Sequence, residues 1–228
     1  MIVVYGILAI LILLVLVVLI RTIKLKPQAV SAEPLPLDVD GERAAQHLGE
    51  AIRLKTVSMA TPEECDWGEW RKFHSFLERA YPLMNSRLER ETINDYALLY
   101  RWKGKDESKL PILLMAHIDV VPVAEGTLSE WKYPPFSGEI AEGYVWGRGA
   151  VDMKGSLIAI AEAVETLLEK GFVPERDVYI SFGHDEEVMG ESGAMDTAAL
   201  LKERGIRKRR GGHLLRVDAQ ALDRILAR

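Results

Sequence analysis

Residues 110–119 read LPILLMAHID and join an apolar run to two titratable side chains. The run 110–116 contains no polar side chain, which is typical of a strand buried on both faces of a sheet. His117 and Asp119 follow it, and residues two apart in an extended chain point to the same side. Metal-binding histidines commonly donate their second ring N–H to a carboxylate. The stretch therefore predicts a metal ligand, His117, that is oriented by Asp119, although a His-x-Asp pair taken alone is more often structural.

On both sides of this strand the chain alternates between the patterns of strands and helices. Apolar residues recur at helical spacing in some segments, and short apolar runs typical of strands separate them. The expected helices are 41–55, 67–81, 155–170 and 192–204, and the expected strands are 96–102, 110–116 and 177–183. Strands that alternate with helices predict an α/β layered domain with a mainly parallel sheet.

A carboxylate precedes the helix expected at 155–170, because residues 147–155 read GRGAVDMKG and contain Asp152. The dipole of a helix favours a carboxylate at this end, so a plain N-cap is one interpretation of Asp152. A carboxylate can also bridge two cations through its two oxygens, as a two-metal site requires. The stretch by itself leaves both interpretations open.

A third group follows the strand expected at 177–183, where residues 182–187 read FGHDEE. Adjacent like charges cost energy unless solvent or a cation compensates them. At a metal site, one glutamate can bind the ion while its neighbour stays free as general base; an acidic surface loop is the alternative. Because open α/β sheets bind ligands beyond the carboxyl ends of their strands, we expect the three groups to form one metal site.

The first twenty residues, MIVVYGILAILILLVLVVLI, include 19 apolar ones. As a helix they would be about 30 Å long, which is the thickness of the hydrocarbon core of a bilayer. We therefore expect residues 1–20 to be a single-pass transmembrane anchor; a cleaved signal peptide and a buried core helix are the alternatives. The basic residues that follow favour a cytoplasmic body, but the side of the membrane stays open. The Pro-rich region 21–39 is expected to be a linker.

The composition limits the remaining classes of protein. The 228 residues carry a net charge of −5 and are 48% apolar, which excludes wholesale disorder. A single cysteine, Cys65, excludes an intrachain disulfide framework and a cysteine-based zinc cluster. His47 and His74 lie on expected amphipathic helices, where packing explains them better than metal binding. The basic run 207–210 is interpreted as a solvated terminus, and we expect no nucleic-acid partner.

Four stretches together resemble one family. The succession MAHIDVVP (115–122), WKYPPFSG (131–138), WGRGAVDMKG (146–155) and FGHDEE (182–187) resembles the dinuclear zinc exopeptidases related to carboxypeptidase S. Aminoacylase, acetylornithine deacetylase and succinyl-diaminopimelate desuccinylase share this signature, and the stretch 131–138 is most similar to the carboxypeptidase S (Gly-X carboxypeptidase) branch. The resemblance covers about residues 40–206. It implies a three-layer αβα catalytic domain with a smaller inserted domain that often dimerises.

The resemblance also implies roles for individual residues. His117 matches a ligand of one zinc ion, and Asp119 matches its supporting acid. Asp152 matches the carboxylate that bridges the two ions, Glu186 the general base, and Glu187 a ligand of the other zinc. The implied reaction is hydrolysis of an amide bond in a small peptide or an N-acyl amino acid, with cobalt or manganese as substitutes for zinc in vitro.

The sequence departs from the family pattern after residue 206. Relatives supply a further acidic ligand and a final histidine, which nothing here matches; His213 and Asp218 are nearby, but their context differs. Residues 202–228 hold nine basic against three acidic residues, which fits a divergent tail at 207–228.

We therefore expect residues 40–206 to be an incomplete catalytic domain without the dimerisation domain. Each zinc would keep two protein ligands, where catalytic sites normally offer three, so activity is expected to be weak or absent. The alternatives are a non-catalytic remnant that binds metal or partners without turnover, and an aminoacylase or deacetylase of small metabolites.

Overall fold

The computed structural model describes residues 2–24 and 39–206, which belong to two separate compact units. Most of the expected linker 21–39 and the whole tail 207–228, with His213 and Asp218, lie outside the described residues. Of the helices and strands in the described residues, α1 (Ile2–Lys24) belongs to the N-terminal unit and the others belong to the larger unit.

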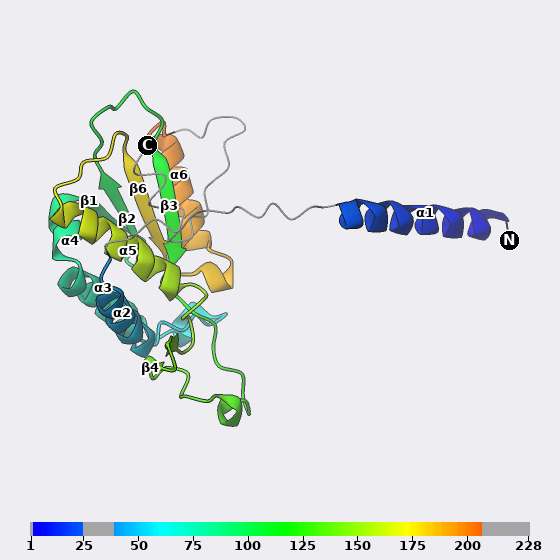
Figure 1. The fold of residues 1–228 in the computed structure, drawn as a ribbon, viewed down its shortest axis with the longest axis horizontal. Helices are drawn as coiled ribbons and strands as arrows, with labels where there is room; N and C mark the ends of the chain where they lie inside the picture. The colour runs from blue at the N-terminus through cyan, green and yellow to red at the C-terminus, as the bar shows by residue number, and fades with distance from the viewer. Residues whose placement is uncertain (1, 25–38, 207–228) are drawn as a thin grey trace. The chain divides into compact units, whose positions relative to one another are not determined.

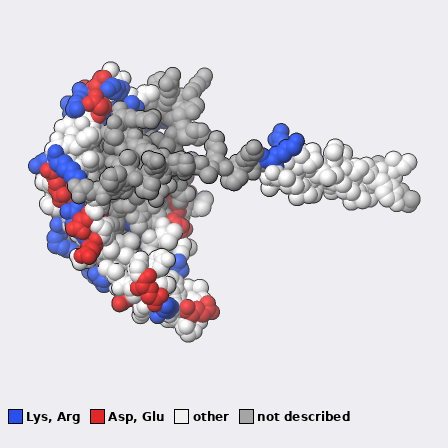
Figure 2. Space-filling view, in the orientation of Figure 1, with Lys and Arg blue, Asp and Glu red and all other residues white. Residues whose placement is uncertain are grey.

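Helix α1 exposes its apolar side chains along its whole length and ends with Arg21 and Lys24 in its last turn. Residues Val4–Lys24 are long and apolar enough to cross a membrane, although a signal sequence would meet the same criterion. The helix continues four residues past the segment 1–20 that the sequence predicts. Figure 2 shows α1 without charged side chains except at this end, whereas acidic and basic side chains are interspersed over the visible face of the larger unit.

The larger unit is built on a four-stranded sheet with the strand order β1-β2-β6-β3. The strands are β1 (Glu89–Ile93), β2 (Ala97–Trp102), β3 (Ile112–His117) and β6 (Val178–Gly183). Only β3 and β6 pair in parallel, and the other two pairings are antiparallel. The prediction of a mainly parallel sheet is therefore wrong. A parallel pair needs a long crossover, which only the connection through a helix between β3 and β6 provides, whereas a tight turn joins β1 to β2.

Helices cover both faces of this sheet (Figure 1). One face packs against helices α2 (Gly41–Arg53), α3 (Trp67–Ala80), α4 (Pro82–Arg87) and α5 (Lys154–Glu169). The other face carries α6 (Asp196–Glu203), whose Leu201 packs on Leu99 and Tyr179 of the sheet. Because side chains alternate along a strand, successive residues of β2 and β6 contribute to the two different cores. The predicted α/β class and its helices at 41–55, 67–81 and 155–170 are confirmed to within two residues at each end.

Several elements escape the sequence patterns. The short helix α4 and strand β1 were not predicted, and neither was a separate two-stranded sheet of β4 (Glu139–Ala141) and β5 (Tyr144–Trp146). The helix expected at 192–204 divides into a π-helical turn, Glu191–Met195, and α6. These elements are three to eight residues long, too short for a hydrophobic period to be visible.

The parallel pairing of β3 with β6 positions the functional residues. In this register His117 lies opposite Gly183, so both strands end at the same edge of the sheet. The loop after β6 therefore begins beside His117, and the chain between β3 and α5 returns to this edge at the start of α5.

Candidate metal centre

His117 is the last residue of β3, and its side chain is 4% exposed. Its Nδ1 lies 2.9 Å from the backbone oxygen of Asp119 and 3.3 Å from Oδ1 of the same residue. The backbone oxygen can only accept, so Nδ1 carries a proton and donates it. Nε2 then faces the opposite way, with Oδ1 of Asp152 at 3.1 Å and Oε2 of Glu186 at 3.7 Å. This is the orientation that a metal-binding histidine requires.

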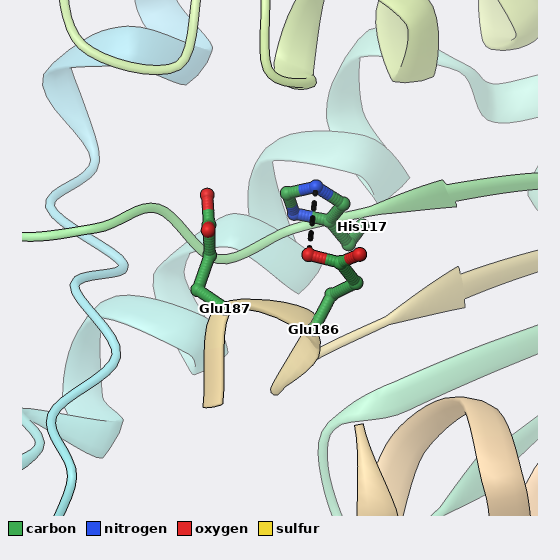
Figure 3. Close-up of side chains that lie close together, drawn as sticks. All are labelled: His117, Glu186 and Glu187. Atoms are coloured by element: carbon green, nitrogen blue, oxygen red, sulfur yellow. Dashed lines mark ion pairs between the residues drawn. The ribbon is translucent and has the colours of Figure 1, made fainter. Parts of the chain in front are cut away.

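Glu186 and Glu187 come from the short turn Glu186–Val188 that directly follows the loop after β6. Figure 3 shows both side chains beside the imidazole of His117 at the end of β3. One ligand atom from each of the three residues lies within 4.8 Å of the others. An imidazole nitrogen together with carboxylate oxygens is a donor set that suits zinc, so these residues fit the metal that the family resemblance implies.

The buried carboxylate of Asp119 connects the two strand ends. It is fully buried, and Oδ2 accepts from Oγ of Ser58 at 2.7 Å and from the backbone N–H of Glu187 at 3.0 Å. Oδ1 accepts from the backbone N–H of Glu186 at 3.2 Å. Burial opposes its charge, but the bonds from His117, Ser58 and Glu187 outweigh burial and hold its pKa below the usual value. Asp119 thereby fixes the position of both glutamates as well as the imidazole.

The charged groups around His117 shift the pKa values of one another. Burial lowers the pKa of His117, but the hydrogen bond and the charge of Asp119, followed by the charge of Glu186, raise it to about 9. Partial burial raises the pKa of Glu187; the charge of His117 opposes this, and the neighbouring carboxylates of Asp152, Asp119 and Glu186 reinforce it. Carboxylates that are held near one another repel, and a cation between them relieves this repulsion.

Asp152 lies in the turn that enters α5, and its side chain is 70% exposed. It faces Nε2 of His117, but it is outside the three-residue group of His117, Glu186 and Glu187. The N-cap of α5 is Met153, with no side-chain cap hydrogen bond. The interpretation of Asp152 as a plain N-cap is therefore wrong, and its carboxylate remains available on the side of His117.

The other titratable residues of the FGHDEE stretch point elsewhere. His184 is buried beside the rings of Trp67 and Tyr96, and Oδ2 of Asp185 accepts from the backbone N–H of Ser192. His47 and His74, which the sequence assigns to packing, bond to Glu162 and to the backbone oxygen of Tyr96.

Two residues of the site were missed by the sequence reasoning. Ser58 belongs to a segment without a motif, 61 residues before its partner Asp119. Lys154 stands inside the quoted stretch 146–155, but nothing in its spacing indicates that its side chain is fully buried.

Known proteins are similar to this chain in sequence. Residues 113–222 match the peptidase family M20/M25/M40, a range that continues past residue 206. "Probable carboxypeptidase S-like 2" of Dictyostelium discoideum is 49% identical over 154 residues, 67% of this chain and 29% of that protein. Carboxypeptidase S of Saccharomyces cerevisiae is 43% identical over 70% of this chain and 29% of its own length. The mouse N-fatty-acyl-amino acid synthase/hydrolase PM20D1 is 41% identical over 72% of this chain and 33% of its own length. The chain thus spans about a third of these relatives or less.

Solved structures share the fold. Human carnosine dipeptidase 1 superposes with a TM-score of 0.57 at 18% identity, over 72% of this chain and 36% of that one. The M20 family metallo-carboxypeptidase Sso-CP2 of Sulfolobus solfataricus gives a TM-score of 0.52 at 25% identity, over 70% of this chain and 35% of that one. The α/β arrangement described above is therefore that of this group of peptidases.

Proposed function

We propose that this chain, whose residues 113–222 belong to the peptidase family M20/M25/M40, provides the metal-binding part of a metal-dependent amide hydrolase. One observation carries the proposal. His117 at the end of β3 meets Glu186 and Glu187 from the loop after β6, and a buried Asp119 holds all three in place.

In this proposal, His117, Asp152 and Glu187 would hold two zinc ions. Zinc supplies Lewis-acid chemistry that polarises a carbonyl and makes water a stronger nucleophile. Glu186 accepts the proton of the attacking water and passes it to the leaving amine. Its carboxylate suits this task, because it is more than half exposed and its Oε2 lies 3.7 Å from Nε2 of His117, beyond hydrogen-bond distance.

The names of the relatives support two substrate classes, small peptides and N-acyl amino acids. Both present an amide bond next to a carboxylate-bearing unit. The anchoring of the chain is part of the same proposal: α1 holds the catalytic unit at a membrane as a single-pass anchor, with the side of the membrane open. Among the described residues, four side chains would supply the ligands and the base, which leaves two protein ligands for each zinc, and we expect such a site to turn over weakly or not at all.

The test is zinc stoichiometry combined with turnover for the purified full chain. We expect metal analysis to find zinc bound in wild type and to find its loss in Glu187→Gln. Hydrolysis of dipeptides and N-acyl amino acids is measured beside it, with Glu186→Gln as the variant that keeps metal and loses any activity. A wild-type chain that holds no zinc at micromolar concentration would contradict the proposed function. Zinc without turnover would indicate a metal-binding remnant.

A further inference from the structure

We infer that Lys154 is a positioning residue, which sets the distance between Asp152 and His117 by tying the start of α5 to the end of α2. The inference deepens the proposed function and rests on it. Lys154 is the first residue of α5 and follows Asp152 by two positions. Its side chain is fully buried, which is rare for a lysine and requires partners for its ammonium group.

The partners of Lys154 are backbone carbonyls at the end of α2. Nζ donates to the oxygens of Ala51 at 2.9 Å and Leu54 at 2.6 Å, and it lies 5.3 Å from the ring centroid of Phe73. The last carbonyls of a helix carry partial negative charge and attract a cation, and these two accept from Lys154 in addition to the backbone N–H groups of Leu54 and Thr56. Among the described ion pairs none involves Lys154, so these carbonyls fix where its ammonium group lies.

The same end of α2 continues into a segment that holds the loop of His117. Thr56 Oγ1 donates to the oxygen of Ile118 at 2.7 Å, and Ser58 Oγ donates to Asp119 at 2.7 Å. Backbone bonds join Val120 to both Thr56 and Ser58. Residues 51–58 therefore bond on one side to the loop of Asp119 and on the other side to Lys154.

Contacts of Lys154 with the turn before α5 fix the position of Asp152. The backbone N–H of Lys154 donates to the oxygen of Gly149 at 2.8 Å, which closes the turn that contains Asp152. Gly149 has φ +83°, and a Cβ on it would lie 2.6 Å from Cγ1 of Val120 and 3.4 Å from Cδ of Lys154. The turn that contains Asp152 is thus packed between the loop after His117 and the side-chain carbons of Lys154. If Lys154 lost its hold on α2, this turn would be free to move relative to His117.

The experiment compares Lys154→Met with Arg43→Met in the full chain. Arg43 also joins α2 to α5, through Glu162, Thr166 and Glu169, but from the first turns of α2 to the middle and end of α5. Both variants should lower the melting temperature. Only Lys154→Met should weaken zinc binding, by about 10- to 100-fold, which is typical when a group that orients a ligand is removed.

A second readout needs no metal. In chain labelled with ¹⁵N-histidine, the Nε2 resonance of His117 reports the neighbouring carboxylate of Asp152. We expect Lys154→Met and Asp152→Asn to shift this resonance, and Arg43→Met to leave it in place. Lys154→Gln keeps one donor for the α2 carbonyls and should cause a smaller shift. It is measured in the same way and takes the place of the methionine variant if that variant does not fold.

Two results distinguish a failure of the proposed function from a failure of the positioning role. If wild type binds no zinc, the proposed function is contradicted, and the histidine resonance alone decides the role of Lys154. If Lys154→Met and Lys154→Gln leave the resonance and the zinc affinity as they are in Arg43→Met, the positioning role is overturned.

Discussion

Two groups in this chain combine a histidine with a buried carboxylate, and they differ in how the charges are balanced. Between α2 and α5, Glu162 accepts bonds from Nε of Arg43 at 2.9 Å, Nδ1 of His47 at 2.5 Å and the hydroxyl of Tyr81 at 3.1 Å. The arginine neutralises the glutamate, and both carboxylate oxygens have partners. This group is complete without any ligand, as buried ion pairs usually are.

At the metal centre, by contrast, carboxylates outnumber cations. Asp119, Asp152 and Glu186 all lie within 4 Å of the one imidazole of His117, and Glu187 is beside them. In the described part of the chain, no lysine or arginine forms an ion pair with any of the four. Residue types alone do not distinguish the two groups. The group whose charges are unbalanced is therefore the one that has room for a cation.

The largest difference between the two groups is expected when the histidine of each group is replaced. We expect His117→Gln to weaken zinc binding by more than about 100-fold, because a ligand is lost, which exceeds the effect of losing an orienting partner. His47→Gln should leave zinc affinity unchanged and lower the free energy of unfolding by about 1 to 3 kcal/mol, because Glu162 loses a buried partner. Isothermal titration with zinc and urea unfolding of both variants check this. Equal zinc affinity in the two variants would show that the two groups do not differ as described.

Within the metal centre, the two glutamates are expected to differ in their effect on zinc binding. Glu187→Gln removes a carboxylate whose pKa is raised by partial burial and by its acidic neighbours. We expect zinc affinity to fall by about 10- to 100-fold. Glu186→Gln should keep most of the affinity, because its role is proton transfer. The Co²⁺ absorption spectrum of each variant measures the ligand field directly. A spectrum that changes in Glu186→Gln and not in Glu187→Gln would reverse the two assigned roles.

The sequence allowed much of this to be predicted, for a physical reason. The candidate residues of the site follow strands or precede a helix, and apolar periodicity locates those elements from local sequence. In the structure, His117, Asp119, Asp152, Glu186 and Glu187 lie together at one edge of the sheet, and their assignment to a metal site stays a prediction. Their individual roles stay predictions, because geometry brings them together without showing which one binds metal and which one moves a proton.

The parts that could not be predicted depend on contacts distant in sequence. The direction of β2 relative to β6 is decided by packing between segments about 80 residues apart. Ser58 and Lys154 act through bonds to Asp119 and to the end of α2, and neither residue type nor spacing indicates these partners. Hydrophobic patterns report which face is buried, but not which buried polar groups meet.

The pH dependence of metal binding distinguishes the two groups by a smaller effect. The pKa of His117 is raised to about 9, so the metal-free site holds a proton at neutral pH that zinc must displace. Zinc affinity should therefore rise as pH increases toward 9, by about tenfold per pH unit, and level off above it. Titration in buffers of different ionisation enthalpy should find roughly one proton released at pH 7 and almost none at pH 10. Zinc binding without proton release at pH 7 would contradict the charge balance described for His117.

The smallest effect is expected from the hydroxyl that supports Asp119. Ser58→Ala leaves Oδ2 of Asp119 with only the N–H of Glu187, and it should lower the free energy of unfolding by about 1 to 2 kcal/mol and zinc affinity by up to about tenfold. The matched control is Thr166→Val, which removes a hydroxyl bonded to Arg43 in the complete group between α2 and α5. It should cost similar stability and leave zinc affinity unchanged. If Ser58→Ala altered stability alone, as Thr166→Val does, the bond from Ser58 would be part of the packing and would contribute nothing to the arrangement of the ligands.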